Sequence, residues 1–340
     1  MAQNLQVVAP RGVARNFDAA AMVTDWEADL WQRVEGGELA ATTATTYTRG
    51  MARFLGWLQE HDQSRGVLAQ RLGPGIIRQW KADLARDGHK AAGINTFYAG
   101  VRRFFKWAVS DRGLAYDPTA GVEGASRRGA TRKHKREALS DAEVLRVLAQ
   151  PDAATLEGAA RVRAVRDRAM LMLMAYTGAR SVEVQRATMG DIRTEGKLKL
   201  MVHGKGHGEA DEELYLVHPD LVDALYCWLA VHPRGGELQA AIFCGLGNRN
   251  QGGALSMRTI RKLVKGYYLQ AGIRDPRKTT HSLRHSLVTN LIRHGVNPTK
   301  IMTVTRHKSL DTLLAYAHEV ERDSDPAEAY VDYSSSVGPM

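Results

Sequence analysis

The sequence predicts a mostly α-helical protein of two domains, with a small β-hairpin in the second domain. Apolar residues recur at a helical period of about 3.6 residues through most of the chain. Apolar and polar residues instead alternate on both sides of a glycine-rich turn between residues 198 and 216. The length of 340 residues exceeds that of a typical single domain. A hydrophobic fraction of 44% is sufficient to give each domain its own core.

The first half of the chain is predicted to form a helical domain. The spacing of its apolar residues indicates four amphipathic helices, at about residues 22–31, 42–61, 74–88 and 91–111. Pro74 suits the first turn of one of these helices, and Gly88 ends it. We therefore expect an N-terminal tail at residues 1–17 and a helical domain at residues 18–120.

The predicted interdomain linker, residues 121–137, is strongly basic. Six basic residues lie within ten positions that contain no acidic residue: Arg127, Arg128, Arg132, Lys133, Lys135 and Arg136. The last helix of the first half adds Arg102, Arg103 and Lys106 on the face opposite its apolar residues. Such cations are either solvated or contact phosphates. A formal net charge of +10 favours a polyanionic partner, and residues 321–340 form a tail of the opposite, acidic sign.

The second domain is expected at residues 138–320. Ser140 and Glu143 have the spacing of a capping box, which marks a helix start. A largely apolar segment then ends at Gly178, a residue type that commonly terminates helices. The alternating stretch at 198–216 predicts the hairpin. The remainder, to about residue 320, is predicted to be mostly helical.

Several classes of protein are excluded by what the sequence contains. The longest nearly pure apolar run, residues 169–175, is far shorter than the roughly 20 residues of a membrane-spanning helix. The N-terminal residues lack the pattern of a secretory signal. Cys227 and Cys244 have no CxxC spacing, so neither a disulfide framework nor a zinc site is expected. These features favour the cytoplasm, in association with the nucleoid.

The polar residues of the second domain form a set whose order is informative. Its members are Arg180, Glu183, Lys205, His281, Arg284, His307 and Tyr316. Taken singly, each has an ordinary explanation, such as a surface ion pair, a solvated turn or a helix cap. Glu183 can share the helix face of Arg180 and orient it, and His281 and Arg284 lie three residues apart on one predicted helix. Tyr316 follows His307 by nine residues.

This order resembles the catalytic domain of the tyrosine recombinases, the phage-integrase and Xer-like family. The matching stretches are TGARSVEV around Arg180, HGKGHGEADEELYLV around Lys205, HSLRH from His281, and TRHKSLDTLLAYAH, which contains Tyr316. The resemblance covers nearly all of residues 137–320. The helical first half is similar to the core-binding domain of the family. The pattern of the family usually has Gly where this chain has Arg306.

The resemblance implies a covalent phosphotyrosine intermediate at Tyr316, with a 3′-phosphotyrosyl bond and no metal or nucleotide cofactor. Arg180 and Arg284 would bind the non-bridging oxygens of the phosphate, and His307 would donate a hydrogen bond to it. His281 is the candidate base or proton relay, and Lys205 the candidate general acid for the leaving oxygen. The acidic surroundings of Tyr330 and Tyr333 make both poorer candidates than Tyr316 for the nucleophile.

The resemblance also implies a C-shaped clamp of two domains around double-stranded DNA with specific recombination sites. Four protomers would act on two sites as a homo-tetramer, with the C-terminal segment of each docking on a neighbour. The lack of a further N-terminal domain argues against the integrases that bind arm sites. Integration, excision, and resolution of a plasmid, mobile element or chromosome dimer remain open as biological roles.

Two other functions compete with recombination. A type IB topoisomerase uses a similar set of Arg, Lys, His and Tyr residues, and relaxation of supercoiled DNA without target sites would favour it. A catalytically silent architectural DNA-binding protein is the alternative from another class. Because every expected catalytic residue is present, the sequence favours the recombinase.

Overall fold

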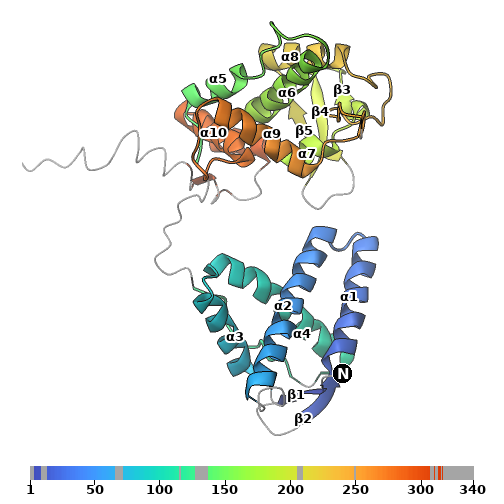
Figure 1. Ribbon diagram of the computed structural model, residues 1–340, viewed down its shortest axis with the longest axis vertical. Helices are drawn as coiled ribbons and strands as arrows, with labels where there is room; N and C mark the ends of the chain where they lie inside the picture. The colour runs from blue at the N-terminus through green and yellow to red at the C-terminus, as the bar shows by residue number, and fades with distance from the viewer. Residues whose placement is uncertain are drawn as a thin grey trace, which may run out of the picture. The chain divides into compact units, whose positions relative to one another are not determined.

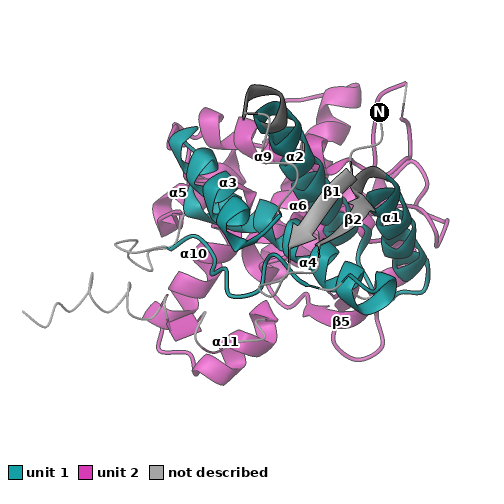
Figure 2. Ribbon diagram, turned by 90° about the horizontal axis from the view of Figure 1, so that it is seen from below, with its two compact units in different colours: residues 1–130 teal, residues 131–340 magenta. Residues whose placement is uncertain are grey.

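The computed structural model describes residues 4–8, 14–65, 72–114, 116–126, 137–204, 210–248, 250–306, 310, 313–314 and 316. The chain divides into two compact units, residues 1–130 and 131–340, which Figure 2 colours separately. Both units are dominated by helices, and the second contains a small antiparallel sheet (Figure 1). The predicted fold class, mostly helical with a small sheet, is confirmed. No helix in the described part of the chain is both long and apolar enough to cross a membrane.

Four helices form the first unit, as the apolar spacing predicts. They are α1 (Ala19–Glu35), α2 (Ala41–Arg65), α3 (Pro74–Arg86) and α4 (Ala91–Arg112). An antiparallel pair of strands, β1 (Asn4–Val8) and β2 (Ala14–Asp18), precedes them. The sequence did not predict this pair, because apolar and polar residues do not alternate in the second strand, ARNFD.

Aromatic side chains fill the core of the first unit. Trp26, Phe54, Trp80 and Phe104 are fully buried, and Phe54 meets Trp80 edge to face with ring centroids 5.0 Å apart. Helices α2 and α4 pack closely along each other. Their close approach requires Gly50, because a Cβ at this position would collide with the backbone of α4.

The residues that follow α4 are attached to the first unit. The hydroxyl of Tyr98 donates to the carbonyls of Thr119, at 3.2 Å, and Val122, at 2.7 Å. Val122 and Leu114 are themselves buried in the aromatic core. The chain therefore remains packed on the first unit as far as residue 126, after the point where the linker was expected to begin. Residues 127–136, which contain the whole basic cluster, lie outside the described residues.

The second unit combines helices with three short strands in the described residues. Its helices are α5 (Asp141–Ala149), α6 (Gly158–Thr177), α7 (Ser181–Arg186), α8 (Pro219–Ala230), α9 (Met257–Gln270), α10 (Thr280–Arg293) and α11 (Pro298–Thr305). A 3-10 turn (Met189–Asp191) leads into the strands β3 (Ile192–Arg193), β4 (Lys199–His203) and β5 (Ala210–Tyr215). The central helix is α6, which is buried along most of its length and packs against α8 and α10.

The sheet of the second unit contains the predicted hairpin. The strand order is β3-β4-β5, and all pairs are antiparallel. Leu200 faces Leu214 across the hairpin, and both are buried in the core. Glu212 pairs with Val202 in the hairpin. Its carboxylate lies 4.0 Å from Nη1 of Arg180, in the turn that follows α6. Residues 205–209, which connect β4 to β5 and include Lys205, are outside the described residues.

Candidate active site

The site begins at the sharp turn between α6 and α7. Gly178 ends α6 with a backbone φ of 65°, in the left-handed region that favours glycine. A side chain at this position would also crowd Leu287, because its Cβ would lie 3.1 Å from a methyl carbon of that residue. The turn leaves Arg180 in an extended conformation at the N-cap position of α7. Its side chain is 24% exposed, which allows a ligand to reach it.

Glu183 holds the guanidinium of Arg180. The backbone N–H of Arg180 donates to Oε2 of Glu183 at 2.7 Å, and Nη1 of Arg180 donates to Oε1 at 2.6 Å. The side chain of Glu183 is only 1% exposed. A buried carboxylate that accepts these bonds restricts the rotation of the arginine, because each acceptor oxygen is already engaged. Glu183 thus contacts both the backbone and the side chain of Arg180.

Arg284 provides a second guanidinium from α10. It is buried, and its Nη1 donates to the carbonyl of Gly178 at 2.8 Å while Nη2 donates to the carbonyl of Thr305. Burial, followed by the positive charges of Arg180 and Arg306, lowers the pKa of Arg284 from 12.5 to about 9. The side chain therefore remains cationic at neutral pH, in a place where positive charges repel one another. An anion bound among them would relieve this repulsion.

Arg306, at the end of α11, brings a third guanidinium to the same place. Its φ of 55° and ψ of 42° are left-handed, and it is the only non-glycine residue with positive φ in the described ranges. This conformation costs a non-glycine residue about 1–2 kcal/mol, which explains why Gly suits the position. Its Nη2 donates to Oε2 of Glu183 at 2.6 Å, and its Nε lies 2.9 Å from Oε2 of Glu212.

Tyr316 lies against the helix that carries Arg284. Its hydroxyl is 3.2 Å from Nε2 of His285, and the two rings are tilted with centroids 4.9 Å apart. The ring is 6% exposed and packs with Val288 and Ile301. A negative charge on Tyr316 is close enough to raise the pKa of Arg284. The phenol therefore lies within electrostatic range of the Arg284 guanidinium.

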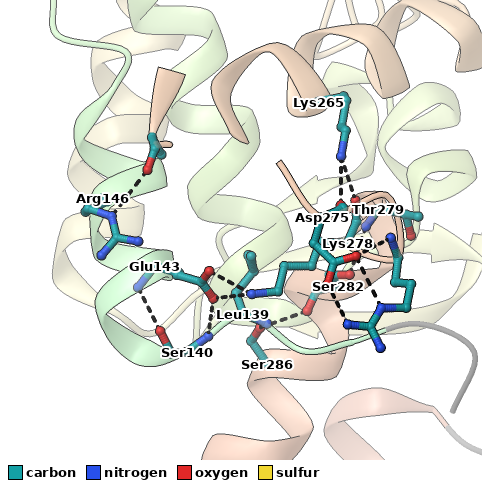
Figure 3. A network of polar contacts seen from close by, with 12 residues as sticks. Leu139, Ser140, Glu143, Arg146, Lys265, Asp275, Lys278, Thr279, Ser282 and Ser286 are labelled. Carbon is teal, nitrogen blue, oxygen red and sulfur yellow. Dashed lines mark hydrogen bonds and ion pairs between the residues drawn. The ribbon is translucent and has the colours of Figure 1, made fainter. Parts of the chain in front are cut away.

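A polar network fixes the start of α10, where His281 lies (Figure 3). Lys278 contacts both carboxylate oxygens of Glu143 at 2.7 Å, and Glu143 closes the predicted capping box with Ser140. The N–H of Leu139 donates to Oγ of Ser286, on α10 itself, at 2.8 Å. The first residues of the second unit are thereby attached to the loop and helix that hold His281, which is half-buried.

The structure brings together some of the predicted site residues and does not describe others. Arg180, Glu183, Arg284 and Tyr316 converge, and His281 lies on the same helix as Arg284. Arg102, Arg103 and Lys106 are exposed on α4, as predicted. Residues outside the described part of the chain include Lys205, His307 and the six linker cations Arg127, Arg128, Arg132, Lys133, Lys135 and Arg136.

Two profiles of known families match the chain. The profile of the phage integrase family matches residues 139–322, which are more than half of the protein. The chain belongs to the phage integrase family. A second profile, of the N-terminal SAM-like domain of phage integrases, matches residues 23–112 in the helical first unit.

Named relatives of this phage integrase family member are tyrosine recombinases. XerC of Rhodospirillum centenum is 32% identical over 315 residues, which cover 90% of this chain and 84% of the relative. XerD of Pseudomonas putida is 29% identical over 300 residues, which cover 85% and 89%. As predicted, the protein is a tyrosine recombinase, an enzyme that cleaves and rejoins DNA strands in site-specific recombination. Nothing in the comparisons favours a topoisomerase or an architectural protein.

Solved structures of the phage integrase family share its fold. XerH recombinase, in a post-cleavage complex with a palindromic difH substrate, superposes with a TM-score of 0.66 at 18% identity, covering 89% of this chain and 84% of that chain. The λ integrase tetramer bound to a Holliday junction has a TM-score of 0.63 at 16% identity, covering 90% and 79%. At these identities the likeness establishes the fold.

Two residues of the site were missed by reasoning from the sequence. The sequence pattern assigns no role to His285, although it is the histidine in contact with Tyr316. A spacing of four residues from His281 was the available signal, because such residues share a helix face. Arg306 was noted only as a departure from Gly. Its sequence neighbours contain no acid, so its pairing with Glu183 could not be predicted.

Proposed function

We propose that this recombinase cleaves DNA with Tyr316 as the nucleophile. The observation that carries the proposal is the contact of the Tyr316 hydroxyl with His285, the neighbour of Arg284 on α10, whose guanidinium is in turn close to those of Arg180 and Arg306. Positive side chains grouped around a phenol suit the attack of an oxyanion on a phosphodiester, because both reacting groups gain negative charge. The site is formed from segments distant in sequence, as expected of a built catalytic site.

The proposed step conserves atoms and charge. The phenolic oxygen of Tyr316 bonds to phosphorus, and the bond to the 5′-oxygen of the next nucleotide breaks, which leaves a 3′-phosphotyrosyl ester and a 5′-hydroxyl. The phenolic proton passes to an imidazole of α10, where His285 contacts the hydroxyl and His281 lies one turn away. Lys205 protonates the leaving oxygen, and His307 donates a hydrogen bond to the phosphate.

Arg180 and Arg284 bind the non-bridging oxygens in this proposal, and Glu183 holds Arg180 in place. Rejoining is the reverse attack by a 5′-hydroxyl on the phosphotyrosyl ester. The energy of the broken phosphodiester is conserved in the ester, so no nucleotide cofactor is required.

We further propose that the helical domain (residues 18–120) and the catalytic domain (residues 138–320) form a C-shaped clamp on duplex DNA, with the linker along its backbone. Four copies would act on two recombination sites, and the acidic segment 321–340 would dock on a neighbouring copy. The complex of XerH with difH and the λ integrase tetramer on a Holliday junction support this assembly. Because such an enzyme acts on chromosomal or plasmid DNA, we propose that it is cytoplasmic and associated with the nucleoid.

Trapping of covalent DNA tests the nucleophile. Cells or extracts that express the protein are lysed in detergent, and DNA that remains attached to the protein is isolated and sequenced. The wild-type protein should retain a discrete set of sites through Tyr316, identified by mass spectrometry of the adducted peptide. Tyr316→Phe should bind the same DNA without any adduct. Adducts that persist in Tyr316→Phe would reject the assignment and redirect it to Tyr330 or Tyr333.

A further inference from the structure

Arg306 stands where the resemblance leads one to expect glycine, and its side chain is built into the site. The side chain of Arg306 is only 7% exposed. It joins two acidic residues from different elements: Glu183 on α7 and Glu212 on β5. A long cationic side chain in an unfavourable backbone conformation persists only where its contacts compensate for the strain.

The contacts of Arg306 converge on the residue that holds Arg180. Oε2 of Glu183 accepts from the backbone N–H of Arg180 at 2.7 Å and from Nη2 of Arg306 at 2.6 Å. Oε1 of the same carboxylate remains for Nη1 of Arg180. Because Arg306 occupies one side of the carboxylate, it limits the orientations that Glu183 can adopt. Arg180 also donates to the backbone carbonyl of Arg306, at 3.4 Å.

Glu212 anchors Arg306 from the other side. Its Oε2 lies 2.9 Å from Nε of Arg306 but 4.0 Å from Nη1 of Arg180, so Arg306 is the nearer partner. The two atoms form an ion pair without a hydrogen bond, and this pairing of Glu212 with Arg306 leaves the 24% exposed guanidinium of Arg180 available to an incoming phosphate. With Arg306 absent, Glu212 would be free to pair with Arg180 and to compete with the phosphate for it.

We propose that Arg306 is a positioning residue for the phosphate-binding guanidinium of Arg180, acting through Glu183 and by occupying Glu212. This inference rests on the proposed function of Arg180. In this proposal the arginine, in place of glycine, contributes to catalysis in two ways. It pairs with Glu212, which keeps Glu212 from pairing with Arg180, and it fixes the orientation of the Glu183 carboxylate.

A neutral phosphate analogue distinguishes positioning from a merely structural role. In a methylphosphonate, a methyl group replaces one charged non-bridging oxygen, so the charge that Arg180 neutralises is absent. The DNA sequence captured with Tyr316 is synthesised in two forms, with a phosphodiester or a methylphosphonate at the scissile position. Single-turnover adduct formation is measured on both. For Arg306→Gly we expect a loss of about 10- to 100-fold on the phosphodiester, the range typical of residues that orient a functional group. On the methylphosphonate the loss should be much smaller.

Three further variants keep the test decisive. Glu212→Gln removes the competing charge, so Arg306→Gly combined with Glu212→Gln should recover part of the lost rate. Arg306→Lys keeps the charge without the two-sided fork and should fall between wild type and Arg306→Gly. Arg234→Gly serves as the matched control, because Arg234 pairs with Glu237 elsewhere in the same unit. This control should form adducts at the wild-type rate.

Two outcomes would overturn the inference: equal losses for Arg306→Gly on both substrates, or no loss on either. If Arg306→Gly unfolds at a much lower temperature than wild type, the same comparison of the two substrates is made with Arg306→Lys instead. Failure of the wild-type protein to form any adduct would instead reject the proposed function, which keeps the two failures distinct.

Discussion

The hydroxyl of Tyr316 lies 3.2 Å from Nε2 of His285, one helical turn beyond His281 on α10. The contact joins the proposed nucleophile to an imidazole that can accept its proton without a change of rotamer. The helix that supplies this imidazole also carries Arg284, so a single element holds both the proposed proton acceptor and a guanidinium proposed to bind the phosphate.

We expect His285→Gln to slow adduct formation by about 100-fold, because general-base catalysis contributes on this scale. The pH dependence of the single-turnover rate should also lose the limb that a general base produces. His281→Gln is the matched variant, one turn away. If His281→Gln removes the limb and His285→Gln keeps it, then His281 is the base and His285 only packs against the phenol.

Lys205→Ala tests the general acid. The variant should cleave normal DNA about 100-fold more slowly than wild type. It should approach the wild-type rate on a 5′-bridging phosphorothiolate, because sulfur leaves without protonation. The measurement is single-turnover adduct formation on both substrates. Equal impairment on the two would mean that Lys205 positions the DNA and donates no proton.

The basic linker should contact the DNA backbone. Each phosphate contact contributes about −0.9 to the slope of log affinity against log salt concentration on B-DNA. Changing Arg127, Arg128, Arg132 and Arg136 together to Ala should weaken binding to specific and random DNA alike and flatten the slope. Affinities of Tyr316→Phe protein, measured between about 50 and 200 mM salt, provide the comparison.

The control for this experiment changes the same four arginines to Lys. It keeps the charge, so the salt slope should remain that of the parent protein. Sequence preference should stay constant in both variants, because phosphate contacts do not read bases. Identical slopes for the alanine variant and the parent would remove the linker from the DNA interface.

Glu143 should make the stability of the protein depend on acidic pH. Burial acts to raise the pKa of Glu143, but hydrogen bonds from Lys278 and from the backbone of Ser140 outweigh it and lower the pKa below 4.5. A carboxyl with a lowered pKa stabilises the fold above the pKa of the unfolded chain, and this contribution is lost as the pH falls through the folded value.

The matched variant for this prediction is Glu143→Gln. At neutral pH it should lower the free energy of unfolding by roughly 1–3 kcal/mol, the scale of hydrogen bonds to charged groups. The difference from wild type should shrink as the pH falls below about 4.5, the ordinary value of the carboxyl. Urea denaturation of both proteins from pH 6 to pH 3 measures it. A difference that is constant over this range would contradict the lowered pKa.

Much of the fold was predictable because its signals are local. The period of apolar residues predicted α2, α3 and α4, since helical neighbours are only three or four positions apart. Ser140 and Glu143 form the capping box that their spacing indicated. Gly178 ends α6 as expected, and the alternation around residues 198–216 became the β4–β5 hairpin. The pair β1–β2 was not predicted, because apolar and polar residues do not alternate in β2.

The sequence by itself determined the mostly helical fold class, the family and the residues proposed to bind a phosphate. The tertiary structure alone decided which of these groups meet. Arg284 binds the carbonyl of Gly178, 106 positions away, and Arg306 shares Glu183 with Arg180 across 123 positions. The side chain next to the hydroxyl of Tyr316 is His285, 31 positions earlier. Contacts at such separations depend on how helices pack against one another, and packing is set by the whole core, not by the spacing of neighbours in the chain.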